Sequence, residues 1–237
     1  MAGRVFAIGD VHGCAAELDT LLGGLGLGAG DTVVCVGDYL DRGPDSRGVI
    51  DVLLALRARD DLTTTFLKGN HEDMCLGWLG LGGRHGDVWM ANGGAIALAS
   101  YGLARGQAPD DVRAALPPAH LAFLTGLEPY RTDGTHLFVH AGVRPARPLA
   151  QQVEEDLFWI RGEFVHHAHG LPWTVVFGHT PVREVLVDLP EKIGIDTGCV
   201  YGGRLTALEL PARVVHQVAR GERSVRSGRL APARRAR

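Results

Sequence analysis

The chain has 237 residues and a net charge of −3, with 46% hydrophobic and 22% charged residues. This composition supports a sizeable core and excludes global disorder, and the glycines follow no collagen-like period. Apolar runs fall far short of the roughly 20 residues of a membrane helix, and the N-terminus lacks the long apolar region of a signal peptide. The four cysteines form no CxxC pair. We therefore expect free thiols in a reducing cytoplasm, without a disulfide framework or a zinc finger.

The N-terminal third alternates between strand-like and helix-like patterns. Short apolar runs predict strands, and leucine, valine and isoleucine at helical spacing predict the helices between them. In chain order the expected elements are a strand at 4–8, a helix at 15–25, a strand at 32–36, a helix at 46–57 and a strand at 63–67. A further helix is expected just after Gly69-Asn70-His71. This alternation is typical of α/β architecture.

Residues 78–133 lack strand alternation, and we expect an inserted segment of helices and loops with a short helix at 118–127. The strands then resume at 136–139, 173–177, 182–189, 192–195 and 204–210, and the last three are expected to close the sheet, some of them antiparallel. No linker precedes residue 218. We therefore predict a single domain over residues 1–218.

Residues 219–237 are expected to form a basic, disordered tail. Residues 220–237 contain seven arginines and one glutamate, without an apolar period. Such a segment cannot bury enough apolar surface to join a core. A solvated tail is the simpler interpretation, because nothing else in the sequence indicates a nucleic-acid partner.

Polar residues of metal-binding types stand at the ends of five predicted strands. They are Asp10 and His12, Asp38, Asn70 and His71, His140, and His179. In α/β sheets, sites form just beyond the carboxyl ends of strands, so we expect these side chains to meet at one rim. Aspartate and histidine bind Mn, Fe or Zn, and paired metals are typical of hydrolytic phosphatases and nucleases. Arg42, in the same loop as Asp38, suits phosphate.

Five motifs follow one another in the order GDVHG (9–13), GDYLDRG (37–43), GNHE (69–72), HAG (140–142) and GHT (178–180). They resemble those of the calcineurin-like metallophosphoesterases. More narrowly, they resemble the PPP family of serine/threonine protein phosphatases in its short bacterial and phage branch. The resemblance runs from residue 4 to about 210. It implies a β-sandwich flanked by helices with a dimetal site at one rim, whereas the strand pattern alone indicates only one open sheet.

The resemblance also implies two divalent ions, with Mn expected and Fe or Zn as alternatives. Their ligands would be Asp10 and His12 for the first ion, Asp38 bridging both, and Asn70, His140 and His179 for the second.

Four further residues take roles from the same resemblance. His71, held by Asp41, would be the general acid that protonates the leaving alkoxide. Arg42 and Arg161 would bind the phosphate. An imidazole can carry a proton near neutral pH, and a neighbouring carboxylate would orient it.

The implied function is metal-dependent phosphomonoester hydrolysis by direct attack of a metal-activated water. The substrate would be a phosphorylated protein or peptide carrying phosphoserine or phosphothreonine, with phosphotyrosine left open. A symmetrical diadenosine-tetraphosphate hydrolase is the alternative, because residues 194–210 resemble the ending of those enzymes too. Asp41 and Glu72 favour the protein phosphatase, and Pro181 after GHT weighs against a nuclease. A phosphate-sensing binding protein is less favoured, because the ligand set is complete.

Two remaining features are interpreted as structural. Trp89 and Asn92-Gly93-Gly94 are expected to serve packing or a turn, and His166, His167 and His169 to lie in a solvent-facing loop.

Overall fold

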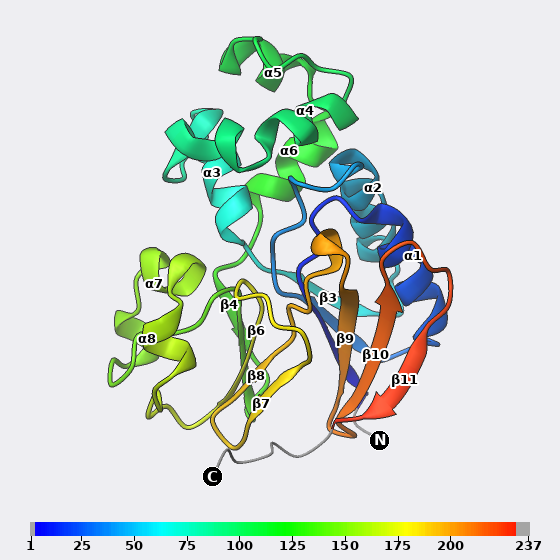
Figure 1. The fold of residues 1–237 in the computed structure, drawn as a ribbon, viewed down its shortest axis with the longest axis vertical. Helices are drawn as coiled ribbons and strands as arrows, with labels where there is room; N and C mark the ends of the chain where they lie inside the picture. The colour runs from blue at the N-terminus through cyan, green and yellow to red at the C-terminus, as the bar shows by residue number, and fades with distance from the viewer. Residues whose placement is uncertain (1–2, 231–237) are drawn as a thin grey trace.

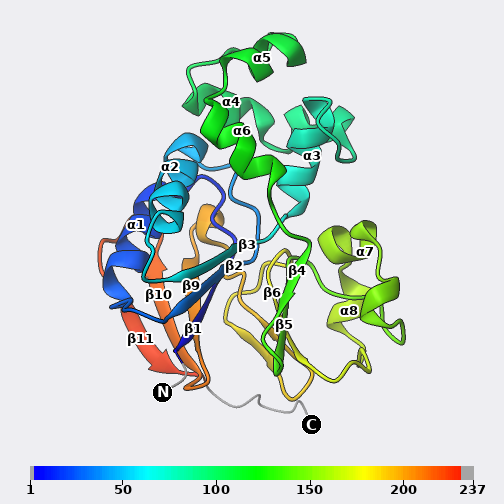
Figure 2. The same cartoon turned by 180° about the vertical axis from the view of Figure 1, so that it is seen from behind.

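Two β-sheets pack face to face, and helices cover their outer faces (Figures 1 and 2). The structure, a computed structural model, describes residues 3–230. Within them the first sheet has six strands in the order β11-β10-β9-β1-β2-β3, and the second has five in the order β4-β5-β6-β8-β7. The fold is therefore the helix-flanked β-sandwich, which confirms the expected fold class.

The strands of the first sheet are β11 (Arg226–Arg229), β10 (Val214–Ala219), β9 (Arg204–Leu210), β1 (Val5–Ile8), β2 (Thr32–Cys35) and β3 (Thr63–Phe66). Those of the second are β4 (Tyr130–Thr132), β5 (His136–Val139), β6 (Thr174–Phe177), β8 (Lys192–Gly194) and β7 (Leu186–Asp188). β1, β2 and β3 pair in parallel, and so do β5, β6 and β8. In each sheet, the carboxyl ends of these three parallel strands therefore lie along one edge.

The helices fall into three groups (Figure 1). Beside the first sheet lie α1 (Ala15–Gly24) and α2 (Ser46–Arg57). Beside the second lie α7 (Glu154–Trp159) and α8 (Gly162–Val165), preceded by the short 3₁₀ helix η2 (Leu149–Gln151). The third group is α3 (Asn70–Trp78), the 3₁₀ helix η1 (Gly86–Asn92), α4 (Gly94–Ser100), α5 (Pro109–Ala115) and α6 (Pro118–Thr125). A last 3₁₀ turn, η3 (Cys199–Tyr201), precedes β9.

Alternate residues of the central strands serve different layers of the core. In β1, Phe6 and Ile8 pack towards the helices, whereas Ala7 joins the cluster between the two sheets. In β6, Val176 belongs to that same intersheet cluster, whereas Val175 packs towards α7 and α8. Because side chains alternate along a strand, a strand covered on both faces is apolar at every position. The single-sheet interpretation of the strand pattern is therefore corrected to two packed sheets.

The N-terminal elements lie where the sequence pattern predicts them, within one residue at each boundary. The inserted segment 78–133 forms η1, α4, α5 and α6, but it also contains β4, which was not expected. The strand expected at 182–189 is shorter, because only Leu186–Asp188 pairs with β8. No helix among residues 3–230 has the length and apolar composition needed to cross a membrane.

The C-terminal segment differs from the expected disordered tail at 219–237. Residues 226–229 form β11, which pairs antiparallel with β10 from Val214↔Arg229 to Gln217↔Arg226. A backbone ladder needs no apolar side chains, since it satisfies N–H and C=O groups directly. Arg220 adds an ion pair with the buried Glu17 in α1, with Nη1 and Oε1 2.5 Å apart. Residues 231–237 of the expected tail lie outside the described part of the chain.

Candidate active site

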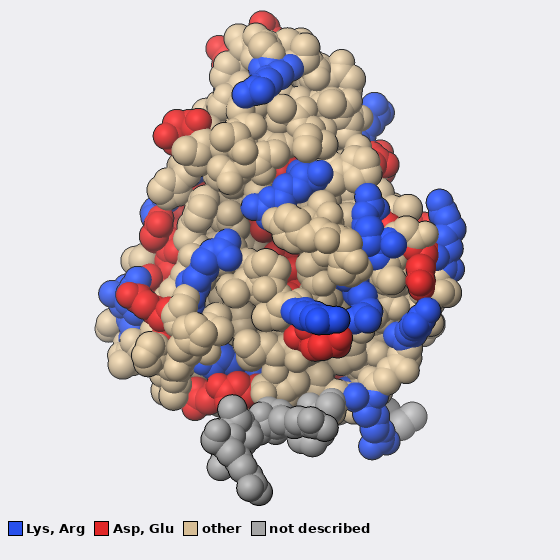
Figure 3. Space-filling model, in the orientation of Figure 1, with Lys and Arg blue, Asp and Glu red and all other residues tan. Residues whose placement is uncertain are grey.

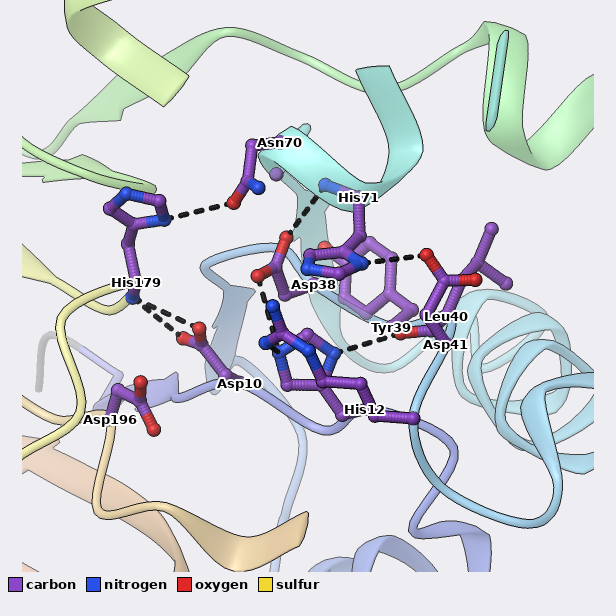
Figure 4. Close-up of polar contacts among 12 residues, drawn as sticks. Asp10, His12, Asp38, Tyr39, Leu40, Asp41, Asn70, His71, His179 and Asp196 are labelled. Atoms are coloured by element: carbon purple, nitrogen blue, oxygen red, sulfur yellow. Dashed lines mark hydrogen bonds and ion pairs between the residues drawn. The ribbon is translucent and has the colours of Figure 1, made fainter. Parts of the chain in front are cut away.

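The side chains predicted to bind metal meet between the two sheets, in the loops after β1, β2, β3, β5 and β6 (Figure 4 shows most of them). Each is at most 4% exposed, and they are Asp10, His12, Asp38, Asn70, His140 and His179. Burying carboxylates and imidazoles together is costly unless charges and hydrogen bonds compensate. This concentration of buried polar groups therefore indicates a site for a charged ligand.

One group of donor atoms surrounds His140. Its Nε2 lies 3.1 Å from Asn70 Oδ1, 3.2 Å from His179 Nδ1 and 3.3 Å from Asp38 Oδ1. The other ring nitrogen, Nδ1, lies 2.9 Å from the Val36 carbonyl oxygen and must donate to it. In a neutral imidazole the lone pair is then on Nε2, which faces other acceptors. Such a convergence of lone pairs suits a cation.

A second group of donor atoms surrounds His12. Its Nδ1 donates to the Leu40 carbonyl oxygen at 2.8 Å, which leaves the lone pair of the neutral ring on Nε2. That nitrogen lies 3.3 Å from Asp38 Oδ2. Each Asp38 oxygen therefore faces a different histidine. This is the orientation that a carboxylate needs to bridge two cations, so the residues fit a dinuclear metal group.

Asp10, in the loop after β1, lies beside the same donor groups. Its two carboxylate oxygens accept the backbone N–H of His179, at 3.1 and 2.9 Å. Burial raises the pKa of Asp10, and the nearby Asp196 and Asp38 add to the rise. Burial also lowers the pKa of His140 to about 4, which keeps its ring neutral at pH 7. Crowded carboxylates beside neutral imidazoles are relieved by bound cations.

His71 and Asp41 form a buried pair beside this site. His71 Nδ1 lies 2.6 Å from Asp41 Oδ2, and both side chains are at most 1% exposed. Burial lowers the pKa of His71 to about 3, and the positive charges of Arg42 and Arg161 act in the same direction. Burial raises the pKa of Asp41. Trp89 Nε1 donates to both Asp41 oxygens, at 3.1 and 2.9 Å, so this tryptophan positions the carboxylate as well as filling the core.

The expected phosphate-binding arginines lie at the edge of the site. Arg42 Nη1 is 2.8 Å from His12 Nε2, and its guanidinium lies 5.6 Å from the ring centre of Tyr201, a side chain 61% exposed. Arg161 Nη1 donates to the His179 carbonyl oxygen at 3.3 Å. The two guanidiniums thus approach the donor groups from the His12 side and the His179 side. A phosphate bound between them would be held by two cations.

The backbone around the site is strained at five non-glycine residues. His12, Asp38, Asp41, Arg42 and His179 all have positive φ angles, between 43° and 72°. Such conformations cost free energy and are concentrated at functional sites. Gly93 backs the loop closely, since a Cβ there would lie 2.7 Å from the Arg42 backbone nitrogen. The Asn92-Gly93-Gly94 turn therefore supports the Asp41–Arg42 loop.

Two acidic residues of the site were not assigned roles from the sequence. Glu72 is fully buried and accepts the backbone N–H groups of Asp38, Tyr39, Leu40 and Gly69 at 2.8–3.1 Å. Burial raises its pKa to about 8. A glutamate at the third position of α3 is half of a capping box, which could have indicated the bond to the Gly69 N–H but not the bonds to the Asp38 loop. Asp196, in the loop after β8, lies beside Asp10 (Figure 4), and no local pattern singles it out.

One expectation about histidines was wrong. His166 and His167 are exposed, but His169 is buried at 1% exposure. Its Nε2 lies 2.8 Å from the Glu191 carbonyl oxygen, and its Nδ1 accepts the Leu171 N–H at 3.0 Å. His169 therefore holds the α8–β6 connection against the β7–β8 turn.

A family model described as calcineurin-like phosphoesterase matches residues 3–209. The serine/threonine-protein phosphatase 1 of Salmonella typhimurium is 32% identical over 86% of this chain and 90% of that protein. The asymmetrical bis(5'-nucleosyl)-tetraphosphatase PrpE of Anoxybacillus flavithermus is 30% identical over 86% of this chain and 89% of that protein.

Solved structures agree with these matches. A crystal structure provisionally described as a diadenosine tetraphosphatase has a TM-score of 0.68 and 29% identity over 93% of this chain and 95% of that chain. A cold-active protein tyrosine phosphatase shares the fold, with a TM-score of 0.63 and 18% identity over 96% of this chain and 80% of that one. Since the family match spans most of the sequence, this chain belongs to the calcineurin-like phosphoesterases, hydrolases of phosphate esters that use a divalent dimetal site.

Proposed function

We propose that this phosphoesterase is a phosphoprotein phosphatase that acts on phosphoserine and phosphothreonine and uses two divalent ions, with Mn as the first candidate and Fe or Zn as alternatives. The proposed ligands are Asp10, His12, Asp38, Asn70, His140 and His179. Asp38 would contact both ions, because its two oxygens face His12 and His140 separately. When bound, such ions activate a water molecule and stabilise charge on the phosphoryl oxygens.

The His71–Asp41 pair is the observation that carries the choice of substrate class. A seryl or threonyl alkoxide is a strongly basic leaving group and requires a proton as it departs, whereas a nucleotide phosphate departs as a stable anion. His71 would supply that proton: its backbone N–H donates to Asp38 Oδ1 at 3.1 Å, and its ring lies against Asp41, with Nδ1 and Oδ2 2.6 Å apart. A proton held by this pair, in which burial raises the pKa of Asp41, would be of most use to a phosphomonoester of an alcohol.

Arg42 and Arg161 would hold the phosphoryl oxygens on either side of the donor groups. Guanidinium groups match phosphate oxygens with paired N–H donors. On the described part of the face in Figure 3, basic and acidic side chains are interspersed. Nucleic-acid-binding domains gather basic residues on one face, and the described part of this face shows no such gathering free of acidic residues.

Hydrolysis of a dinucleoside tetraphosphate is the second candidate. The relative PrpE and the structure provisionally described as a diadenosine tetraphosphatase favour it. The exposed Tyr201 ring beside Arg42 offers a flat surface for an adenine as well as for a phosphotyrosine.

Three substrates tested side by side decide between these functions. Mn-loaded protein is assayed on a phosphothreonine peptide, a phosphotyrosine peptide and diadenosine tetraphosphate, with Asp38→Asn as the inactive control. We expect the highest kcat/KM on the phosphothreonine peptide. A kcat/KM at least tenfold higher on the dinucleotide would assign the second function. In that case two ADP would mark symmetrical cleavage, and ATP with AMP would mark asymmetrical cleavage.

A further inference from the structure

Two of the four cysteines face each other beside the site. Cys14 precedes α1, and Cys199 begins η3. Both are buried, at 1% and 2% exposure. Their sulfur atoms and a carboxylate oxygen of Glu17 all lie within 4.8 Å of one another. Because the backbone brings the start of α1 against the turn before β9, residues from opposite ends of the chain form one cluster (Figure 1).

The other two cysteines lack such surroundings. Cys35 is buried in β2 and Cys75 in α3, and among residues 3–230 neither belongs to a group of three close histidine, cysteine or acidic side chains. The protein therefore contains a paired set and an unpaired set of buried thiols. Cys14 and Cys199 therefore differ from Cys35 and Cys75 in having a second thiol close by in space.

We propose that Cys14 and Cys199 are an oxidation site, at which a peroxide converts the two thiols into an intramolecular disulfide. A disulfide requires the sulfur atoms to approach to about 2.05 Å. Cys14 is the N-cap residue of α1 and Cys199 is the first residue of η3, and their sulfur atoms, which lie within 4.8 Å of each other, would have to move together to form the bond. The proposal does not depend on which phosphoester the enzyme hydrolyses.

The chemistry balances with hydrogen peroxide as the oxidant. The sulfur of one thiol bonds to a peroxide oxygen, the O–O bond breaks, and a sulfenic acid and one water form. The sulfur of the second thiol then displaces the hydroxyl of the sulfenic acid, which leaves as a second water. Two thiols are oxidised by two electrons, and the peroxide is reduced by the same two.

A metal ion is the competing occupant of this cluster. Glu17 Oε2 is buried without a hydrogen-bond partner, which would suit a cation. However, Glu17 Oε1 already accepts Arg220 Nη1 at 2.5 Å and the Gly221 N–H at 2.8 Å. The guanidinium places a positive charge beside the cluster, and three donors are one short of a structural tetrahedral zinc site. These features favour the disulfide.

The bond would lie close to the proposed metal ligands. Cys14 Sγ is 3.5 Å from the His12 carbonyl oxygen, and Cys199 is three residues from Asp196. The disulfide would therefore link the loop after β1 to the loop after β8. Oxidation at this point would join two segments that contribute buried acidic groups to the site.

The test counts thiols in the folded, metal-loaded protein before and after hydrogen peroxide. Samples are denatured in the presence of an alkylating agent, and intact masses and peptide maps are recorded. We expect two of the four thiols to be lost together, one crosslinked peptide to contain Cys14 and Cys199, and dithiothreitol to restore both. Cys14→Ala and Cys199→Ala should abolish the crosslink, whereas the matched buried control Cys35→Ala should retain it.

Three results of the thiol count would overturn the proposal. They are retention of all four thiols, oxidation to sulfinic acid without a crosslink, and a crosslink between other cysteines. Native mass spectrometry before oxidation tests whether a metal ion occupies the cluster of Cys14, Glu17 and Cys199. A zinc ion beyond two per chain that is lost in Cys14→Ala but kept in Cys35→Ala would assign a metal site instead. The wild-type peptide map gives its answer even if one variant does not fold.

Discussion

Asp38 is the residue on which both groups of donor atoms depend. Its two carboxylate oxygens face different histidines, and burial would raise its pKa, but the surrounding histidines lower it well below the ordinary value. Its position is enforced by the backbone, because Glu72 accepts the Asp38 N–H at 2.9 Å. An ionised carboxylate held in this way suits two cations at once.

Asp38→Asn should therefore be the most damaging single ligand substitution. The amide keeps one acceptor oxygen but loses the charge and one of the two acceptors. We expect loss of at least one metal equivalent and a fall in kcat of about 10³-fold or more, a loss of roughly 4 kcal/mol of transition-state stabilisation. Metal content by elemental analysis and kcat on p-nitrophenyl phosphate provide the measurement. Two bound metals with near-normal turnover would contradict the bridging role.

The leaving group should reveal what His71 does. A p-nitrophenolate leaves as a stable anion, whereas a threonyl alkoxide needs a proton. His71→Asn should slow hydrolysis of a phosphothreonine peptide by roughly 10²–10⁴-fold and that of p-nitrophenyl phosphate by much less. The measurement is kcat on both substrates with metal content verified. Equal losses on both would leave His71 only a positioning or phosphate-binding role.

Asp41 and Trp89 provide graded controls for the same experiment. Asp41→Asn keeps the imidazole but loses the carboxyl group that orients it, so its effect on the peptide should lie between wild type and His71→Asn. Trp89→Phe removes the N–H that reaches both Asp41 oxygens and keeps most of the packing. It should therefore show a weaker form of the Asp41 effect, again larger on the peptide than on the aryl ester.

At the scale of elements, β11 is an edge strand that charge alone does not predict. Its four residues, Arg226–Arg229, are exposed, yet they pair along β10. Arg220 and Gly221, which lead into it, bond to Glu17 of α1. The ladder stabilises the sheet from the side opposite β3, away from the strand ends that form the site.

Removal of residues 222–237 should therefore lower stability without altering the chemistry. This truncation deletes β11 but leaves Arg220 and Gly221 in place. We expect Tm to fall by about 2–8 °C, since 1 kcal/mol corresponds to about 2–4 °C in a domain of this size. kcat at 25 °C should stay within about twofold of wild type, and deletion of 231–237 alone is the control. An unchanged Tm after the longer deletion would show that β11 contributes nothing.

Another element-scale contact ties the start of β1 to the turn before β2. Asp31 accepts the Arg4 backbone N–H at 3.1 Å, the Gly28 N–H at 2.9 Å and Arg4 Nη2 at 2.6 Å. Burial would raise the pKa of Asp31, but these hydrogen bonds outweigh it and lower the pKa. The folded state therefore favours the ionised carboxylate.

This contact should make part of the stability dependent on pH. A group whose pKa is lowered by folding stabilises the protein above its unfolded pKa, about 3.9 for aspartate, and the stabilisation is lost as pH falls through the folded pKa. The free-energy difference between wild type and Asp31→Asn should thus be constant from pH 7 to 5 and shrink below about pH 4. Urea unfolding across this range measures it, and a constant difference down to pH 3 would refute the linkage.

For the molecule as a whole, the site joins the two sheets. Its proposed ligands come from loops after β1, β2 and β3 in one sheet and after β5 and β6 in the other. Any ion bound only by the native arrangement stabilises that arrangement by mass action. Metal binding should therefore support folding as well as activity.

Chelation should accordingly lower both turnover and thermal stability. We expect EDTA to abolish hydrolysis of p-nitrophenyl phosphate and to reduce Tm by several degrees, and Mn to restore both after the chelator is removed. The Asp38→Asn variant is the control, since its Tm should respond less to EDTA. Undiminished turnover in metal-free protein would show that the activity needs no metal.

The sequence alone determined the positions of seven strands, the order of the motifs and the residues that converge at the strand ends. The seven strands are β1, β2, β3, β5, β6, β8 and β9. These features are local. Short β-branched runs favour strands, apolar residues at helical spacing favour α1 and α2, and a polar residue directly after a strand must lie at its carboxyl end. Parallel pairing then brings such residues from neighbouring strands to one edge.

The tertiary structure alone decided which distant groups meet. An apolar run such as Thr174–Phe177 indicates that a strand is buried, but it does not indicate which sheet or helix covers the strand. The strand pattern therefore could not predict the packing of two sheets into a β-sandwich. The same holds for Glu72 under the Asp38 loop, Trp89 against Asp41, and Cys14 facing Cys199. Each contact joins residues far apart in the chain, and a one-dimensional pattern carries information only about near neighbours.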